Sequence, residues 1–532
     1  MSLDGFLTFT GLMIATYAIL SPVSRLRLRL NLYRQLVLAV LAVLLVGFFE
    51  FYFELKSVAP SSLDTIFKYV NFEQNTDGFT HQEAAFLVVV AWLMLAALLH
   101  SVARPRAIGL RTLMVLSERL HDEGRYLELV ELVGPYLETI KRSTERRLFG
   151  QRLHHQILDI YLKATNPFSS FGVTTKSYIP KAFARHIRPL ALLIPSRHRA
   201  YEAASSIEGM ILKSDGIRHL LLRLKPGFVM KLMDRQGWEH DEFRTRYFQD
   251  SLNDNASHFY RELEANQNMD GRFAYFIDPK NVLLTGFFSV ASTAAKYGIW
   301  KPIGDEAARL IRSDLDYRKL LNGPCPDDDG LQSDPVNKAI YFFDIMVTSA
   351  AKQGVADHMW LMYMSVFVRE LELIHDVTDD RVDLNDEFPT LGNRLTYEAT
   401  RRLRKWILIA KDLPVDSPHL SPNSLQGRDG ASIPYWAARD CVVAMRCLLK
   451  SERLTESFVT GHLESYLRDL ASLPREGSLS VLRIQMIEGL IHGDRNYGGE
   501  DLRANISRFV GGVDHVVIYE VPDFQELLER DD

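Results

Sequence analysis

Residues Leu36 to Phe49 read LVLAVLAVLLVGFF, a run without a charged side chain. Two similar runs flank it, from Gly5 to Leu20 and from Ala84 to Leu99. A helix needs about 20 consecutive apolar residues, and at least roughly 17, to cross the hydrocarbon core of a bilayer. Each run reaches this length when its polar-tipped ends lie at the interface, so we predict three transmembrane helices. They lie at about residues 4–21, 35–55 and 84–103.

A cleaved signal peptide is the alternative interpretation of the first run. Signal peptides begin with a basic segment and end in a small-residue cleavage site. This chain begins MSLD at Met1, and the residues from Ser21 to Ser24 lack a convincing cleavage pattern. We therefore favour an uncleaved helix.

The charges of the loops predict the orientation of these helices. Residues 21–35 contain four arginines and no acidic residue, whereas residues 56–83 contain more acidic than basic residues. Basic loops stay on the cytoplasmic side of a membrane. The N-terminus is therefore expected outside and everything after Ala103 in the cytoplasm, which is the topology of a bacterial inner-membrane protein.

Two groups of charged residues in this region are candidate functional residues. Arginines beside the membrane are suited to anionic lipid headgroups, and carboxylates at membrane depth can mark an ion pathway. The alternatives are a simple topology signal for the arginines and an interfacial position beside aromatic residues for the carboxylates. The candidates for headgroup contacts are Arg25, Arg27, Arg29, Arg104 and Arg106. The candidate intramembrane carboxylates are Glu50 and Glu54.

Beyond residue 106 the chain has the composition of an ordinary globular protein. The 532 residues are 47% hydrophobic and 24% charged, with a net charge of −5. This composition excludes a disordered chain, collagen and a small disulfide scaffold. Nucleic-acid binding is not expected, because no basic domain is available to neutralise phosphates. Recurrent helical periodicity predicts a mainly α fold, with three N-terminal transmembrane helices followed by a large cytoplasmic α-helical domain with minor β structure.

Loops rich in proline, serine and glycine predict the domain boundaries. The minor β component is expected as a short hairpin near 272–284 and a short strand near 516–521, where β-branched and aromatic residues follow turn residues. The predicted parts are a membrane domain at 1–106, a membrane-proximal helical hairpin at 107–165, a central helical domain at 181–413 and a C-terminal helical unit at 432–532.

Motifs of the common catalytic classes are absent from the sequence. Neither a phosphate-binding glycine loop nor the serine-hydrolase and zinc-protease motifs occur. Cys325, Cys441 and Cys447 form no Cys-x-x-Cys pair. The acidic loops at 327–329 and 376–387 do not match the twelve-residue calcium loop, although metal binding there stays open. We predict no cofactor, no metal site and no catalytic residues, and we lean against an enzyme.

These observations favour a membrane-anchored scaffold or signalling protein. Its cytoplasmic helical domain would bind a protein partner, and its helices would hold it in the lipid bilayer, either as a monomer or as a homo-oligomer. A membrane-disrupting or channel-forming effector gated by the cytoplasmic domain is one alternative, with Glu50 and Glu54 as its support. A membrane-anchored enzyme with an unrecognised site is the other alternative.

Overall fold

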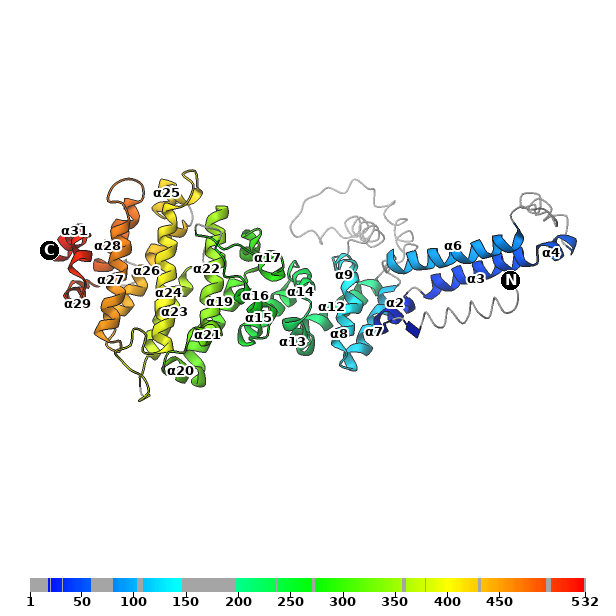
Figure 1. Cartoon of the computed structure of the whole chain (residues 1–532), viewed down its shortest axis with the longest axis horizontal. Coiled ribbons are helices and arrows are strands. Elements are labelled where there is room, and N and C mark those ends of the chain that lie inside the picture. The colour runs from blue at the N-terminus through cyan, green and yellow to red at the C-terminus, as the bar shows by residue number, and fades with distance from the viewer. Residues whose placement is uncertain are drawn as a thin grey trace, which may run out of the picture. The chain divides into compact units, whose positions relative to one another are not determined.

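The chain forms two compact units, Met1–Leu220 and Leu221–Asp532, in a computed structural model that is mainly α-helical, as the sequence predicts (Figure 1). Within the described residues, β structure is limited to isolated bridges. The structure describes residues 18–19, 21–30, 32–58, 80–102, 109–145, 198–235, 237–269, 273–355, 360–377, 379–428, 432–493 and 499–530.

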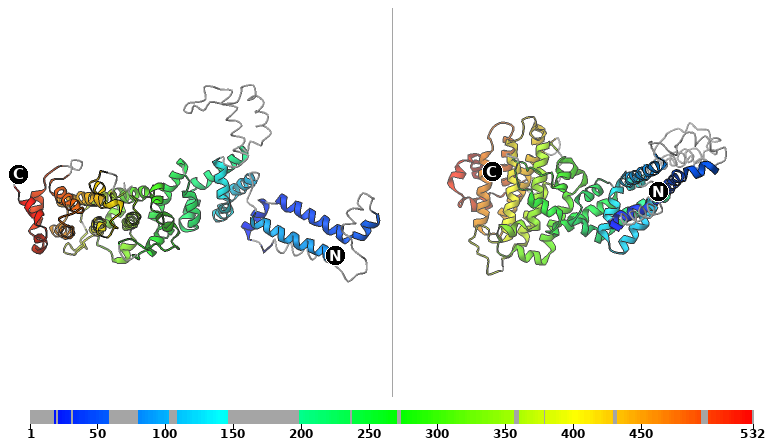
Figure 2. Two further views of the ribbon diagram at one scale, coloured as in Figure 1. Left: turned by 90° about the horizontal axis from the view of Figure 1, so that it is seen from above. Right: turned by 45° about the vertical axis from the view of Figure 1, so that its right-hand side comes forward.

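In the first unit, α3 and α6 lie side by side as an antiparallel pair (Figures 1 and 2). The rings of Phe53, beyond the end of α3, and His81, at the start of α6, lie 5.2 Å apart between centroids. The helices of this unit are α2 (Pro22–Leu30), α3 (Leu32–Glu50), α4 (Tyr52–Val58), α6 (His81–Val102), α7 (Gly109–Asp122), α8 (Tyr126–Val133), α9 (Leu137–Thr144) and α12 (His198–Lys213), followed by α13 (Asp215–Arg223).

The predicted transmembrane helices are not confirmed. Across the part of the chain that the structure describes, no helix combines the length and the apolar character that crossing a membrane requires. The first predicted helix, at 4–21, falls almost wholly outside the described residues. The second, at 35–55, corresponds to α3 and the start of α4, and the third, at 84–103, corresponds to α6.

The antiparallel pair of α3 and α6 exposes many of its apolar side chains. Leu44 on α3 and Phe86 on α6 are each 66% exposed. Soluble monomers rarely expose contiguous apolar patches larger than a few hundred Å². The other exposed large side chains on the two helices are Leu36, Val37, Val40, Leu41, Val43, Leu45, Leu87, Leu93, Met94 and Leu95.

The second unit is a two-layered stack of helices that follow one another along the chain (Figure 1). In one layer α15, α19, α23, α26 and α28 pack each against the next, and in the other α22 packs against α24 and α24 against α27. Helical hairpins stacked in this way are the architecture of α-solenoids. The helices of the layers are α15 (Trp238–Asn253), α19 (Trp300–Ser313), α22 (Pro335–Gln353), α23 (Met362–Ile374), α24 (Leu391–Leu408), α26 (Ile433–Lys450), α27 (Glu456–Ser472) and α28 (Ser480–His492).

Shorter helices connect and close the stack. They are α14 (Pro226–Met233), α16 (His258–Ala265), α17 (Val282–Phe288), α18 (Ser292–Tyr297), α20 (Leu315–Leu321), α21 (Asp328–Gln332), α25 (Pro422–Leu425), α29 (Arg503–Val510), α30 (His515–Tyr519) and α31 (Pro522–Glu529).

The predicted β-hairpin near 272–284 is not formed by the described residues of this segment. Met269 and Tyr275 form one antiparallel bridge, but the expected second strand is the first turn of α17. The buried carboxylate of Glu262 accepts hydrogen bonds from the backbone N–H of Leu283, at 2.9 Å, and from the next N–H. A carboxylate on these otherwise unpaired N–H groups stabilises a helix N-terminus. This distant contact overrides the local strand propensity.

The predicted strand near 516–521 is also wrong, because these residues begin in α30. The Asp514 side chain accepts a hydrogen bond from the backbone N–H of Val516 at 3.0 Å and so caps the helix. Val517 is buried on the inner side of this short helix. β-branched residues thus fill a helix whose start is fixed by its cap.

Buried arginines cap the C-termini of neighbouring helices in the second unit. Arg244 donates hydrogen bonds to the carbonyl oxygens of Met233 and Arg235, at 3.0 and 2.8 Å, where α14 ends. Arg446 donates to the Leu490 carbonyl, at 2.7 Å, in the last turn of α28. Cations are favourable at helix C-termini, where the last carbonyls lack intrahelical partners. These contacts tie successive helices of the stack together.

Arg483 gives a test of this capping. It is 1% exposed and donates to the Leu470 carbonyl at the end of α27, to the Leu473 carbonyl and to both carboxylate oxygens of Asp523. Arg483→Met should lower the free energy of unfolding by about 2–3 kcal/mol, because buried acceptors lose a charged donor. Arg468→Met, which removes an exposed ion pair with Glu464, should cost under about 1 kcal/mol. Equal losses in guanidinium unfolding of the two variants would contradict this account.

Candidate functional site

Of the arginines predicted to contact lipid headgroups, Arg25 and Arg27 do not share one helix face. Arg25 and Arg27 lie in α2, and residues two positions apart in an α-helix point to opposite sides. Arg27 donates a 2.8 Å hydrogen bond to the carbonyl of Glu131 in the last turn of α8, and Arg25 donates to the carbonyl of Ala18. A headgroup role for these arginines stays a prediction. The side chain of Arg29 and the whole of Arg104 and Arg106 lie outside the described residues.

The predicted intramembrane carboxylates fall at the end of α3 and in α4. Glu50 is the last residue of α3 and is half-buried. Glu54 lies one turn further, in α4, with its side chain outside the described part. Between them, Tyr52 is fully buried and packs edge-to-face against Phe48 and Phe53. An ion pathway through these carboxylates stays a prediction.

The acidic loops show local roles in the structure. The Asp327 carboxylate accepts a 2.9 Å hydrogen bond from the Gly330 N–H and caps α21, and Asp379 pairs with Arg381 at 2.7 Å. Within the described ranges, no three His, Cys, Asp or Glu side chains come together in a way that could hold a metal ion. Cys325, Cys441 and Cys447 are free thiols.

A basic pocket in the second unit is the candidate functional site. Its volume is about 520 Å³, and its walls come from α21, α22, α24 and the segment that leads into α17. This size lies within the range of small-molecule sites. Five of its lining side chains are cationic and two are carboxylates. The cations are Lys338, Arg394, Arg401, Arg402 and Lys405, and the carboxylates are Asp328 and Glu398.

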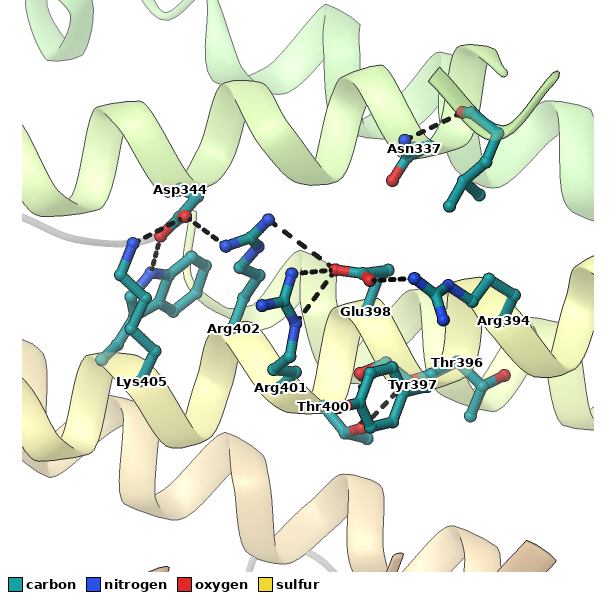
Figure 3. A network of polar contacts seen from close by, with 12 residues as sticks. Asn337, Asp344, Arg394, Thr396, Tyr397, Glu398, Thr400, Arg401, Arg402 and Lys405 are labelled. Atoms are coloured by element: carbon teal, nitrogen blue, oxygen red, sulfur yellow. Dashed lines mark hydrogen bonds and ion pairs between the residues drawn. The ribbon is translucent and has the colours of Figure 1, made fainter. Parts of the chain in front are cut away.

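Asp344 of α22 anchors the floor of the pocket (Figure 3). The residue is fully buried, within an otherwise apolar stretch of the helix. Its carboxylate accepts hydrogen bonds from the Tyr275 hydroxyl at 2.6 Å and from the Trp406 indole N–H at 2.8 Å. It also pairs with Arg402 and Lys405, each at 2.9 Å. These contacts fix the two cations and the tyrosine that line the pocket.

The electrostatics of this group follow from burial and charge. Burial on its own would raise the pKa of Asp344, but Arg402 and Lys405 outweigh it, so the pKa lies below the usual value. Burial lowers the pKa of Lys405 despite its pairing with Asp344, and the neighbouring Arg402 adds to that lowering. Positive charge is therefore crowded at this end of the pocket, where a further anion would be favourable.

Glu398 holds the other arginines in place (Figure 3). Its carboxylate lies 2.5 Å from Arg401, 3.5 Å from Arg394 and 3.7 Å from Arg402. Arg402 thus lies between Glu398 and Asp344. The guanidinium group of Arg394 also stacks over the Phe388 ring, 4.5 Å from its centroid. Glu398 and Asp344 together are thus shared by four cations of α24, which leaves part of the positive charge uncompensated.

Lys338 is the unusual member of the pocket wall. It is only 3% exposed, and its ammonium lies 5.0 Å from the centroid of the Tyr260 ring. Among the described residues, no carboxylate comes within ion-pair distance of it and no hydrogen-bond acceptor contacts it. The exposed Glu264 acts on it electrostatically, but burial dominates and lowers the pKa of Lys338. An ammonium that lines the pocket without a carboxylate within ion-pair distance favours an anion beside it.

This site was not predicted from the sequence, although two signals in the sequence point to it. Arg394, Glu398, Arg401 and Lys405 recur at spacings of three and four, which places charged side chains on one face of α24. In α22 a lone aspartate interrupts the apolar run from Ala339 to Ala351. A single acid in such a run indicates a buried carboxylate that needs cationic partners.

Comparison of the chain with protein-family models, with curated proteins and with solved structures finds no match.

Proposed function

We propose that this chain is a membrane-attached binding protein whose second unit holds a small anionic ligand in the basic pocket. The observation that carries the proposal is Lys338, a lysine of the pocket wall that is 3% exposed and has no carboxylate within ion-pair distance among the described residues. The remaining lining cations add to it, because they outnumber the carboxylates that neutralise them. The pocket offers hydrogen-bond donors and positive charge, which suit binding better than acid–base catalysis.

A thermal-shift experiment tests the binding proposal. A few millimolar sulfate, compared with chloride at equal ionic strength, should raise the unfolding temperature of the full chain, since a ligand that binds only the folded state stabilises it. Lys338→Gln should lose most of this shift. The control Lys319→Gln, which removes an exposed cation paired with Asp316, should keep it. Equal shifts in both variants would mean that sulfate acts elsewhere or through the solvent.

Membrane attachment through α3 and α6 is supported by their exposed apolar side chains. Apolar surface of this kind is stable when lipid or protein covers it. The loop charges place the second unit on the cytoplasmic side of the membrane in this proposal. Association of the helix pair with lipid is compatible with either a monomer or a homo-oligomer.

Charges on the exposed face of the helix pair should release the protein from membranes. Leu44→Lys together with Phe86→Lys puts two ammonium groups on side chains that are each 66% exposed. Each lysine costs up to about 3 kcal/mol in hydrocarbon. The matched control is Leu315→Lys with Leu320→Lys, at exposed leucines of α20. We expect the first variant to leave the membrane fraction after an alkaline wash and the control to stay. Identical partitioning of both variants would overturn lipid attachment through this face.

A protein partner for the second unit remains part of the proposal. Stacked helical hairpins present extended surfaces, and solenoid proteins use these surfaces to bind partners. The basic pocket lies between helices of the stack. A partner bound to the stack would therefore detect whether the pocket holds its ligand.

A further inference from the structure

We infer that the ligand of the basic pocket is an organic phosphate monoester that carries two negative charges. This inference rests on the proposed function, since it names the chemistry of a ligand for the same pocket. Three features support it: the balance of charge, the kind of donor and the shape of the remaining wall.

The charge balance favours a dianion. Five cations line the pocket, and three carboxylates neutralise part of their charge, two in the wall and Asp344 beneath them. Two positive charges are left over among these groups, and the exposed Glu264 acts on Lys338 only from outside the pocket wall. A ligand with one negative charge leaves one of them uncompensated in a partly buried site, whereas a dianion balances both.

The donors favour a tetrahedral oxyanion. Arginine and lysine together supply a planar fork of N–H groups and a compact point charge, the combination that binds phosphate. They come from two helices, Lys338 from α22 and the other cations from α24, and line one space. A phosphate monoester presents three acceptor oxygens on one centre. It can therefore contact both helices at once.

The rest of the wall favours an organic group on the phosphate. The Tyr341 hydroxyl donates to the Asn266 carbonyl, so the half-buried Tyr341 presents its ring rather than its hydroxyl to the pocket. Tyr275 is buried behind it, with the Lys405 ammonium 4.8 Å from its ring centroid. The two rings meet edge-to-face with centroids 5.2 Å apart. Met269 and Leu331 add apolar surface. A pocket of about 520 Å³ is the size of a site for a drug-like molecule, which a bare inorganic ion would not fill.

Calorimetric titration of the purified full chain with three benzene derivatives tests this inference. Phenyl phosphate is a dianionic monoester at pH 8, benzenesulfonate is a tetrahedral oxyanion with one charge, and phthalate carries its two charges on separate carboxylates. We expect phenyl phosphate to bind at least tenfold more tightly than either of the others. Its affinity should fall as the pH drops below about 6, where a phosphate monoester loses its second charge.

Two variants locate the binding. Lys338→Gln and Arg401→Gln should each weaken phenyl phosphate binding at least tenfold, and the exposed Lys319→Gln should not change it. Displacement of phenyl phosphate by vesicles containing phosphatidic acid would assign the monoester to a lipid headgroup. Failure of such vesicles to displace it would assign it to a soluble ester.

The failures of the inference and of the proposed function are distinguishable. Equal or tighter binding of benzenesulfonate or phthalate, lost in Lys338→Gln, would overturn the monoester and leave anion binding in the pocket intact. Absence of binding for all three compounds would overturn both. Binding that the pocket variants do not change would also overturn both, because the anion would then bind elsewhere.

Discussion

Replacing Asp344 with alanine is expected to lower the free energy of unfolding by about 3–5 kcal/mol, the largest effect of any substitution considered for this chain. The carboxylate is fully buried and holds Arg402, Lys405 and the Trp406 indole at distances of 2.8–2.9 Å. Removing it leaves the charges of Arg402 and Lys405, the Trp406 indole N–H and the Tyr275 hydroxyl without their acceptor. The loss of unfolding free energy therefore comes mainly from these partners, which stay buried without an acceptor.

Chemical unfolding of the full chain measures this effect, with Asp316→Ala as the matched control. Asp316 is an exposed aspartate that pairs with Lys319, and its loss should cost under about 1 kcal/mol. A loss for Asp344→Ala as small as that of the control would show that the ion pairs in the pocket floor are not formed.

The stabilising effect of Asp344 should also depend on pH. The pKa of Asp344 lies below its usual value, so the folded state favours the ionised form. Its contribution is fully present above the unfolded pKa, near about 4, and is lost as the pH falls through the lower folded value. The stability difference between the native chain and Asp344→Asn should therefore be constant at higher pH and narrow as the pH falls below about 4.

Replacing Lys338 with methionine is expected to change stability and binding in opposite directions. Burial of the Lys338 side chain disfavours its charged form, so an apolar side chain of similar size is expected to stabilise the fold. The contact with the Tyr260 ring offsets part of this cost, so we expect the ligand-free protein to gain about 1–2 kcal/mol. Phenyl phosphate affinity should fall at least tenfold.

The matched control for this variant is Lys319→Met, at an exposed lysine of α20. It should leave the unfolding free energy within about 0.5 kcal/mol of the native value and should not alter ligand binding. If Lys338→Met instead destabilises the protein, the lysine stabilises the fold. No ligand is then needed to explain its position in the pocket wall.

The sequence predicts the mainly α class because helical periodicity is local. Of the apolar residues predicted to form one stripe in α7, Leu113, Leu116 and Leu120 are buried, whereas Val115 is 54% exposed. The two strand predictions failed because the deciding contacts are not contained in the local pattern. Glu262 caps α17 from another helix, and Asp514 caps α30 in spite of its β-branched residues.

The pocket could not be predicted from the sequence for a related reason. The charges of α24 form a periodic pattern, but their partner Asp344 lies on α22, separated from them by α23. Periodicity shows which residues share a helix face and not which helix that face meets. Lys338 looks like any surface lysine in the sequence, and only packing shows that it is buried.

Anomalous diffraction from crystals of the full chain soaked in selenate tests the central claim most directly. Selenate is a tetrahedral dianion, so it replaces the phosphate group of the proposed ligand and marks its own position. The account predicts an anomalous peak in the basic pocket, within hydrogen-bond distance of Lys338 Nζ and of at least one arginine of α24, which is lost in Lys338→Gln. A pocket without a peak at a selenate concentration that fills other sites would contradict it.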